Sequence, residues 1–412
     1  MVNDGIKKSA LAVLKKNLVQ GDGFFYTCPS LRTYQHQWFW DSCFHAIVWT
    51  YFNPEYAKME LLTLVKKQFD NGLIPHMLYW KRAKGRTAKL GDILFKRAWP
   101  EKDRSHITQP PVLAQAVAKV YEKTMDDEFL NKMIHPLIKF YDWLHDERNL
   151  AISGDGLVSI IHPWESGLDA SPTWDHVHDI TRLLNVRIIV WYNTIIKKNN
   201  EANWDIEQIK EQNDFLVKEI GFNVIYIINL RILANLCKTL GLKKRANEYL
   251  TRAETAQKTL VKKCWSKEDL FFYSITSIED KILPEKTVTG LFPLLLNIDP
   301  RKINYLIYNY LINPNEFWLP YPIPSVAKSS PKFNPNGGAT MIIWRGPTWV
   351  NTNWYIVKAL QYHGFHGLAQ YIISKMKVMI EQSGFREQYN PINATAYGAK
   401  NFSWSTLIVD LL

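Results

Sequence analysis

Apolar residues recur at helical spacing along nearly the whole chain. Within 54–69, PEYAKMELLTLVKKQF, they stand at i, i+4, i+7 and i+8 behind a proline in the first turn, and 242–264 repeats the pattern. Residues 347–363 begin with proline and are followed by Gly364, which is the usual order at the two ends of a helix. The same reading predicts further helices near 6–19, 41–53, 110–124, 127–147, 175–198, 206–239, 287–297, 301–312, 365–382 and 403–412.

Strand signals are few, at 157–161 and 270–275, and strands do not alternate with helices. The long stretches without helical periodicity hold most of the glycine and proline and half of the tryptophan. Loops of this length inside a compact domain are usually functional. They cover 20–40, 71–108, 148–174, 313–346 and 383–402.

No change of composition and no Ser/Gly-rich linker divides the 412 residues, of which 47% are hydrophobic and 22% charged. We therefore expect a single folded domain over 1–412, of the all-α class and built from stacked helical hairpins. A closed α/α toroid fits this pattern, and periodicity alone leaves an open solenoid as the alternative.

Composition excludes several other classes of protein. The four cysteines form no CxxC pair, which argues against a zinc site or a disulfide framework and favours a cytoplasmic location. The N-terminal segment has lysines inside its apolar pattern, as an amphipathic helix does and a signal peptide does not, and no run of about eighteen apolar residues predicts a membrane span. The net charge of +11 is scattered over the polar faces of helices, so we expect no nucleic-acid surface.

Three loops in the first third of the chain carry candidate binding residues. Trp38, Trp40 and Asp41 stand in TYQHQWFWDSCFHAIVW at the start of a helix, where Asp41 is either a ligand-binding group or an N-cap. His76 follows a proline in GLIPHMLYW, and Gln109 precedes the double proline that opens the next helix.

The stretch 162–175, HPWESGLDASPTWD, places Glu165, Asp169 and Asp175 among two tryptophans. A carboxyl group pressed against an indole ring is desolvated, which favours its neutral form and raises its pKa. Such a group can donate a proton to a leaving oxygen. Glu387 stands in a second acidic loop, among tyrosine, phenylalanine and tryptophan, and Trp344, Arg345 and Trp349 occupy the loop between the two.

Two carboxyl groups and many aromatic rings suit glycoside hydrolysis. One carboxylic acid protonates the leaving group, and one carboxylate activates water or attacks the sugar. Indole faces offer platforms for pyranose rings, while polar side chains fix the hydroxyl groups. A purely structural role for the tryptophans, with an acidic surface loop beside them, is the alternative.

The ordered blocks QWFWDSCFHA, IPH, TQPP, HPWESGLDASPTWD, WRGPTWVNTNW and EQYNP with NFSWS resemble glycoside hydrolase family 63 and its relatives, which include trehalase-like enzymes. The resemblance runs from about residue 30 to the C-terminus. The chain length is most similar to that of the mannosylglycerate or glucosylglycerate hydrolases of this group.

The resemblance implies an (α/α)6 barrel and an inverting mechanism without metal or cofactor. It assigns Asp169 as general acid and Glu387 as general base. Glu165 is then a supporting or hydroxyl-binding group. The sequence itself indicates that Asp175, just before the next helical segment, is its N-cap, and that His162, beside a proline, is a loop hydrogen-bonding residue. The positions that shape the sugar site and wall the cavity are Tyr34, Trp38, Trp40, Asp41, His76, Gln109, Trp164, Trp344 and Trp349.

The chain departs from the family pattern at two places, Ala170 and the pair Asn393-Ala394, where relatives carry a polar residue and Thr-Gly. Trp354 and Trp404 are read as core residues. Arg345 is a candidate to hold a substrate carboxylate through a bidentate pair.

The resulting hypothesis is an inverting α-glycosidase that acts on mannosylglycerate or glucosylglycerate, with homo-oligomerisation left open. The alternatives are a trehalase-type or oligosaccharide α-glucosidase and, in another class, a non-catalytic carbohydrate-binding barrel.

Overall fold

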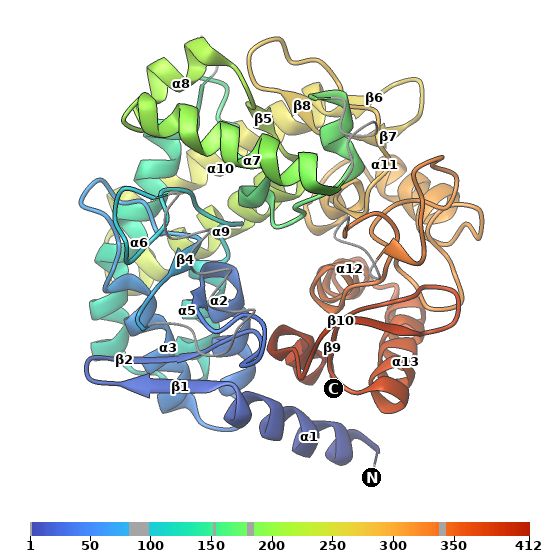
Figure 1. Cartoon of the computed structure of the whole chain (residues 1–412), viewed down its shortest axis with the longest axis horizontal. Coiled ribbons are helices and arrows are strands. Elements are labelled where there is room, and N and C mark those ends of the chain that lie inside the picture. Colours follow the sequence, from blue (N-terminus) through green and yellow to red (C-terminus); the bar gives the residue numbers. More distant parts are fainter. Residues whose placement is uncertain (1, 82–98, 151–153, 179–184, 338–342) are drawn as a thin grey trace.

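The computed structural model describes residues 2–81, 99–150, 154–178, 185–337 and 343–412. Parts of the predicted loops 71–108, 148–174 and 313–346, and of the predicted helix 175–198, lie outside these residues. The structure is mostly helical, and helical hairpins follow one another round a ring (Figure 1).

An inner layer of helical elements closes on itself within the described part of the chain. Each element contacts the next one along the chain, and the last contacts the first. In order they are α2 (Phe39–Trp49), α5 (Leu113–Thr124), α9 (Ile220–Thr239), the 3₁₀ helix η3 (Val288–Leu295), α12 (Val350–Tyr362) and the 3₁₀ helix η6 (Ser403–Leu411).

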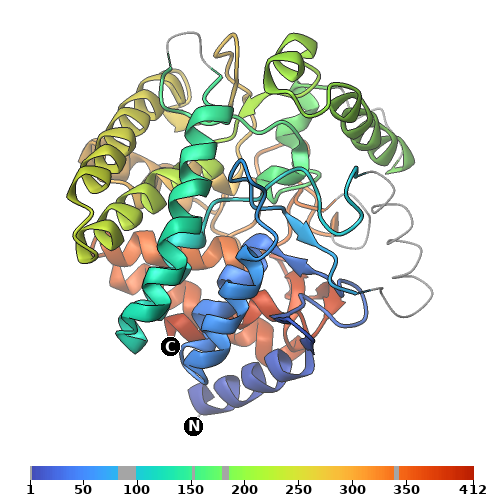
Figure 2. The ribbon, with the colours of Figure 1, turned by 90° about the vertical axis from the view of Figure 1, so that its left-hand side faces the viewer.

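Each inner element packs against a more exposed helix. Figure 2 shows two of these outer helices, α3 and α6, side by side. The outer set comprises α3 (Pro54–Val65), α6 (Asp127–Arg148), α10 (Lys243–Lys263), α11 (Pro300–Tyr305) with the π-helix η4 (Leu306–Leu311), α13 (His366–Ser383) and α1 (Val2–Lys16).

The two layers differ in pattern for a physical reason. All residues of α2 are buried, because neighbours cover it on every side. Helix α10 buries only one stripe, which includes Ala246, Ala253 and Leu260, and turns Lys243, Lys244, Lys258 and Lys262 to solvent. The inner helix α2 is therefore covered on every side, whereas the outer helix α10 is amphipathic.

The described residues also form five two-stranded antiparallel sheets in the segments between the helices. Two of them position candidate site residues: β3 pairs with β4 in the register Trp38↔Met77, and β9 pairs with β10 in the register Gln388↔Tyr397. The pairs are β1 (Leu18–Gly21) with β2 (Phe24–Thr27), β3 (Gln37–Trp38) with β4 (Met77–Leu78), β5 (Val217–Lys218) with β8 (Ile275–Thr276), β6 (Trp265–Ser266) with β7 (Phe271–Phe272), and β9 (Arg386–Tyr389) with β10 (Ala396–Lys400).

Several predicted elements are corrected. The helix predicted over 206–239 is two helices, α8 (Ile206–Gln212) and α9, because Asn213 adopts a left-handed conformation and the Glu219 side chain caps a new helix start. The 287–297 helix is 3₁₀ and contains a proline that lacks an N–H donor. The predicted strand 157–161 forms only a bridge from Ile160 to Val217, and α7 is described from Asn185 to Glu201.

Helix α9 alone among the helices of the described residues is long and apolar enough to cross a membrane. Its most apolar window is 78% buried inside the protein. A core helix has the same length and composition, and α9 is one of the inner elements of the ring.

Candidate active site

The predicted site residues come together at one end of the ring, where the inner helices begin. Trp40 and Asp41 lie in the first turn of α2, Trp349 is the N-cap residue of α12, and Glu387 is in β9. Asp169 follows the short 3₁₀ helix η1 (Pro163–Ser166). Segments from the first, middle and last thirds of the chain thus form one site.

Asp169 stands in a loop held by hydrogen bonds to its main chain. Its carbonyl accepts from the Tyr192 hydroxyl of α7, the next carbonyl accepts from Nε of Arg345 at 2.9 Å, and Trp174 Nε1 donates to Leu168 O at 3.0 Å. Burial, and after it the negative charge of Glu387, raise the pKa of Asp169 to about 7. Asp169 is therefore suited to keep a proton near neutral pH.

Both carboxylate oxygens of Glu387 accept hydrogen bonds from the protein. The Tyr34 hydroxyl donates to Oε1 at 3.1 Å, and the Ala399 N–H donates to Oε2 at 2.8 Å. Burial raises the pKa of Glu387, while these two hydrogen bonds act in the other direction by stabilising the carboxylate. Gly398 fits closely against this group, since a Cβ there would lie 2.3 Å from Oε2.

Asp41 is a third carboxyl group of the site. The helix begins at Trp38, which is the N-cap, so Asp41 is not the cap and lies inside the first turn. Asp41 is 3% exposed and its Oδ1 has no hydrogen-bond partner among the described residues. Burial, followed by the charges of Glu387 and Glu60, raises its pKa well above the usual range.

Tryptophan rings pack into a wall that includes Trp40, which lies in the first turn of α2 next to Asp41. Trp344 and Trp349 stack with their centroids 3.6 Å apart and their planes at 6°. Trp404 meets the edge of Trp40 at 5.3 Å and lies 5.7 Å from Trp349, so it joins this wall and is not remote core. Trp344 has φ 67°, a conformation rare for an aromatic residue, and such strain recurs at functional sites.

His76 belongs to a second aromatic group. Its ring stacks on Trp164 at 6.0 Å and 19° and meets Trp38 edge-on at 5.2 Å. Tyr34 lies edge-on to Trp38 at 6.0 Å and so links this group to Glu387. Trp354 belongs to neither group. Its Nε1 donates to Asp410 at 2.9 Å, which is not one of the candidate site carboxyl groups, as expected for a core residue.

Two predicted binding residues support the site from within the protein. Glu165 forms a buried pair with Arg148, with two N–O distances of 2.8 Å, and also accepts from the N–H groups of Thr108 and Ile161. Both carboxylate oxygens are thus occupied, so Glu165 is a support and not a hydroxyl-binding group. Gln109 Oε1 accepts from the Trp40 N–H at 3.2 Å.

The predicted role of Asp175 as a helix N-cap is wrong. Asp175 lies inside the 3₁₀ helix η2 (Pro172–His176), and its two oxygens accept from Nη1 and Nη2 of Arg345 at 2.8 and 2.7 Å. Arg345 does form a bidentate pair, but with this carboxylate of the protein. Its Nε is also occupied, so Arg345 is a structural link within the protein and does not fit the predicted role of holding a substrate carboxylate.

The hydrogen bonds of His162 and the conformation of Ala394 fit the sequence analysis. His162 Nδ1 accepts from the Trp164 N–H at 3.1 Å, and Nε2 lies 3.3 Å from Tyr192 O, so His162 organises the loop. Ala394 has φ 61°, which glycine adopts without steric cost.

Sequence reasoning missed the partners that hold the site residues in place. Arg148 and Tyr192 lie on helices whose periodicity gives no sign of a site, and Ser105 is one serine among many. Gly398 could have been suspected from the sequence, because it stands a few residues after the EQYNP block that contains Glu387. Each partner is recognised only once distant segments are brought together.

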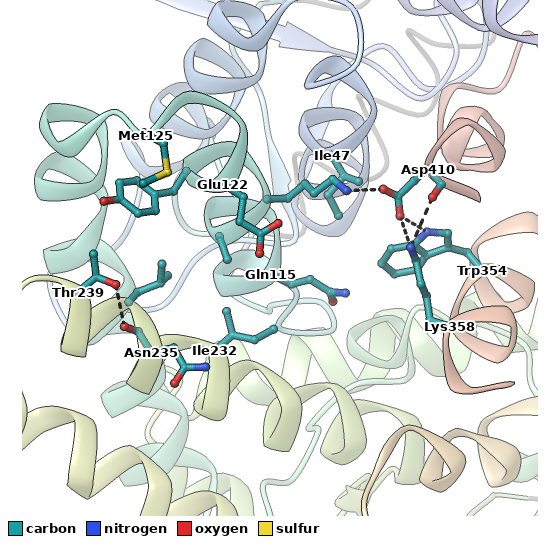
Figure 3. A pocket seen from close by; sticks show the side chains of 14 residues that line it. Ile47, Gln115, Glu122, Met125, Ile232, Asn235, Thr239, Trp354, Lys358 and Asp410 are labelled. Atoms are coloured by element: carbon teal, nitrogen blue, oxygen red, sulfur yellow. Dashed lines mark hydrogen bonds and ion pairs between the residues drawn. The ribbon is translucent and has the colours of Figure 1, made fainter. Parts of the chain in front are cut away.

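No group of three or more His, Cys, Asp or Glu in the described ranges is arranged to hold a metal ion. All four cysteines are buried and unpaired. A cavity of about 520 Å³ lies at the opposite end of the ring, between the C-terminal halves of α5 and α9 and the residues Lys358 and Asp410 (Figure 3). It is separate from the acidic site.

Comparison with known proteins places the whole chain beside one group of enzymes. The family model for the mannosylglycerate hydrolase MGH1-like glycoside hydrolase domain matches residues 34–405. The chain is 30% identical to the mannosylglycerate hydrolase of Thermus thermophilus over 97% of this chain and 98% of that one. It is 24% identical to the glucosylglycerate hydrolase of Mycolicibacterium hassiacum, over 91% of each chain.

Solved structures agree. A crystal structure of a family 63 mannosylglycerate hydrolase from Thermus thermophilus, in complex with Tris and D-glycerate, matches with a TM-score of 0.85, 29% identity and 98% of both chains covered. A neutral trehalase from Saccharomyces cerevisiae matches with a TM-score of 0.62 over 94% of this chain and 73% of its own, and at 13% identity it supports the fold alone.

Proposed function

The chain belongs to the mannosylglycerate hydrolase MGH1-like glycoside hydrolase family, and from this premise we propose that it hydrolyses a small α-linked glycoside, mannosylglycerate or glucosylglycerate, with inversion at the anomeric carbon. Glycoside hydrolase activity follows from the family. The choice of substrate rests on the named activities of the relatives.

The mechanism rests on a difference between two buried carboxyl groups. Burial and a nearby negative charge favour the protonated form of Asp169, whereas hydrogen bonds to its oxygens favour the carboxylate form of Glu387. Asp169, with a pKa raised to about 7, protonates the glycosidic oxygen as the bond breaks. Glu387, whose carboxylate accepts from Tyr34 and Ala399, takes a proton from the water that attacks the anomeric carbon. Each group is then returned to its starting state by exchange of one proton with solvent.

The sugar lies against Trp40 and the Trp344–Trp349 stack in this proposal. Asp41 is the third buried carboxyl group of the site, and in this proposal it accepts a hydrogen bond from a sugar hydroxyl group. A charged aglycone needs a cation other than Arg345, because its guanidinium group is already paired.

We also propose that the ring is an (α/α)6 barrel. The support is the closed order of contacts α2–α5–α9–η3–α12–η6 in the described residues, each element with an outer helical partner. The acids lie where the inner helices begin.

A substrate panel and product analysis test the proposal. Purified protein is assayed on mannosylglycerate, glucosylglycerate, trehalose and kojibiose, with Asp169→Asn and Glu387→Gln as inactive controls. Proton NMR should show the β-anomer first. Turnover of trehalose or kojibiose alone would replace the substrate assignment, and an initial α-anomer would reject inversion.

The two carboxyl variants should each lower kcat by about 10²–10⁴-fold, the usual contribution of one acid or base. Full activity of Asp169→Asn would remove Asp169 from the mechanism while leaving the family assignment in place.

A further inference from the structure

His76 has one ring nitrogen bound by the protein and one that is not. Nδ1 lies 2.7 Å from Ser105 Oγ. Nε2 has no hydrogen-bond partner in the described part of the chain and is not among the buried polar atoms sealed from solvent. The ring is 2% exposed and lies beside Trp38 and Trp164.

The main chain holds Ser105 and His76 at a fixed separation. The Ser105 N–H donates to Met77 O at 3.1 Å, and the His76 N–H donates to Ile107 O at 2.7 Å. These bonds tie the segment around His76 to the segment around Ser105. The contact between the two side chains is therefore part of a rigid ladder.

The surroundings of Ser105 Oγ decide where its proton goes. The oxygen already accepts the Met77 N–H at 3.1 Å. Its proton can reach Ile107 O, which is 3.5 Å away and already accepts the His76 N–H, or His76 Nδ1 at 2.7 Å. The shorter contact is much the better hydrogen bond, so the hydroxyl donates to Nδ1.

The state of the ring agrees with this. Burial lowers the pKa of His76 to about 3, and the neighbouring His162 acts in the same direction. The imidazole is therefore neutral near pH 7 and carries one proton. With Nδ1 accepting from Ser105, that proton is on Nε2.

We propose that Ser105 is a positioning residue that holds His76 in the Nε2–H tautomer, so that His76 donates a hydrogen bond from Nε2 to an oxygen of the bound glycoside. This deepens the proposed function and rests on it. The ligand group required is an acceptor, such as the lone pair of a sugar hydroxyl or ring oxygen. Ser105 acts only through His76.

The tautomer can be measured without any substrate. Protein labelled with ¹⁵N-histidine gives long-range proton–nitrogen correlations that distinguish a protonated Nε2 from a protonated Nδ1, and His76→Gln identifies the His76 signals by their loss. We expect Nε2–H in the wild type and a shift toward mixed tautomers in Ser105→Ala. An Nδ1–H signal for His76 in the wild type would overturn the proposal.

Kinetics test the role in catalysis. Glutamine places an amide N–H near Nε2, and asparagine places one near Nδ1, so His76→Gln should retain roughly tenfold more kcat/KM than His76→Asn. Equal losses in the two variants would contradict a donor at Nε2.

A double-mutant cycle separates positioning from packing. Ser105→Ala should lower kcat/KM roughly tenfold in the wild type and have almost no effect in a His76→Ala background. The matched control is Ser274→Ala. The Ser274 hydroxyl is also buried and accepts a main-chain N–H, that of Ile220, at 3.1 Å. Its removal should leave kcat/KM unchanged. An equal effect of Ser105→Ala in both backgrounds would show that Ser105 has a structural role only and does not act through His76.

If no glycoside is turned over, the proposed function fails, while the tautomer measurement still decides the state of His76.

Discussion

The guanidinium of Arg345 and the carboxylate of Asp175 meet through two parallel hydrogen bonds of 2.8 and 2.7 Å, although 170 positions separate them in the chain. The same arginine binds the carbonyl of Ala170 through Nε. One side chain therefore fastens the loop of Asp169 to the segment that carries the tryptophan stack. It sets the position of Asp169 relative to the Trp344–Trp349 stack.

Arg345→Lys should lower kcat by about 10–100-fold, because an ammonium group cannot span both oxygens of Asp175 and also hold Ala170, and small displacements of a catalytic group are costly. Steady-state kinetics on the preferred glycoside measure the effect. Arg301→Lys is the matched control, since Arg301 forms a similar fork with Asp299 but is 92% exposed. A wild-type kcat in Arg345→Lys would show that the fork does not position Asp169.

The raised pKa of Asp169 predicts a dependence of stability on pH. An unfolded aspartate has a pKa of about 3.9, whereas that of Asp169 in the folded protein is about 7. Between these values the folded state binds more protons, so this group lowers the free energy of unfolding as the pH rises from about 4 to about 7. Its contribution is constant outside that window.

Asp169→Asn removes this contribution, so the stability of the variant relative to wild type should increase across the same window and then level off. Urea unfolding at several pH values between about 4 and about 8.5 measures it. Asp70→Asn, at an exposed position, should give a difference that does not change with pH in this way. A parallel course of the Asp169→Asn and wild-type curves would mean that Asp169 titrates normally.

Gly398→Ala should displace Glu387 and lower kcat by at least tenfold, because the new methyl group would lie 2.3 Å from its Oε2. Gly241→Ala is the control: its φ of 74° is close to the 67° of Gly398, but nothing lies within 4 Å of its Cβ position. Both variants carry the same backbone strain, which separates strain from displacement. Similar kinetics in the two variants would contradict the prediction.

Glu165→Gln should reduce the free energy of unfolding by about 3–5 kcal/mol, because it leaves the Arg148 cation buried without a counter-ion. Denaturant unfolding measures the change. Glu55→Gln removes one partner of an exposed pair with Lys58 and should cost less than about 1 kcal/mol. A small effect at Glu165 would show that water reaches Arg148 in the folded protein.

Local sequence was enough to predict the parts of the site that lie within one loop. Tryptophans beside acids in 162–175 and around Glu387 indicated buried carboxyl groups, and burial does raise the pKa of Asp169 and Glu387. Helical periodicity also located most of the helices, because an amphipathic stripe is a property of neighbouring residues.

What could not be predicted depends on partners from distant segments. The sequence shows that Arg345 can form a bidentate pair but not that Asp175 occupies it. Ser105 carries no motif, and its importance comes from a 2.7 Å contact across 29 positions. The break between α8 and α9 escaped periodicity because it depends on the left-handed conformation of Asn213 and on the cap formed by Glu219, which helical spacing does not reveal.

The closed ring has a consequence for how the protein is made. Helix α2 is buried on all sides, partly against η6 (Ser403–Leu411), so the part of its apolar surface that η6 covers stays uncovered until residues 403–411 have been synthesised. Asp410, which binds Lys119 at 2.8 Å and Lys358 at 2.8 Å, then fastens the late segment to α5 and α12. During synthesis part of an inner, apolar helix therefore stays uncovered until η6 is made, and exposed apolar surface of this kind favours aggregation.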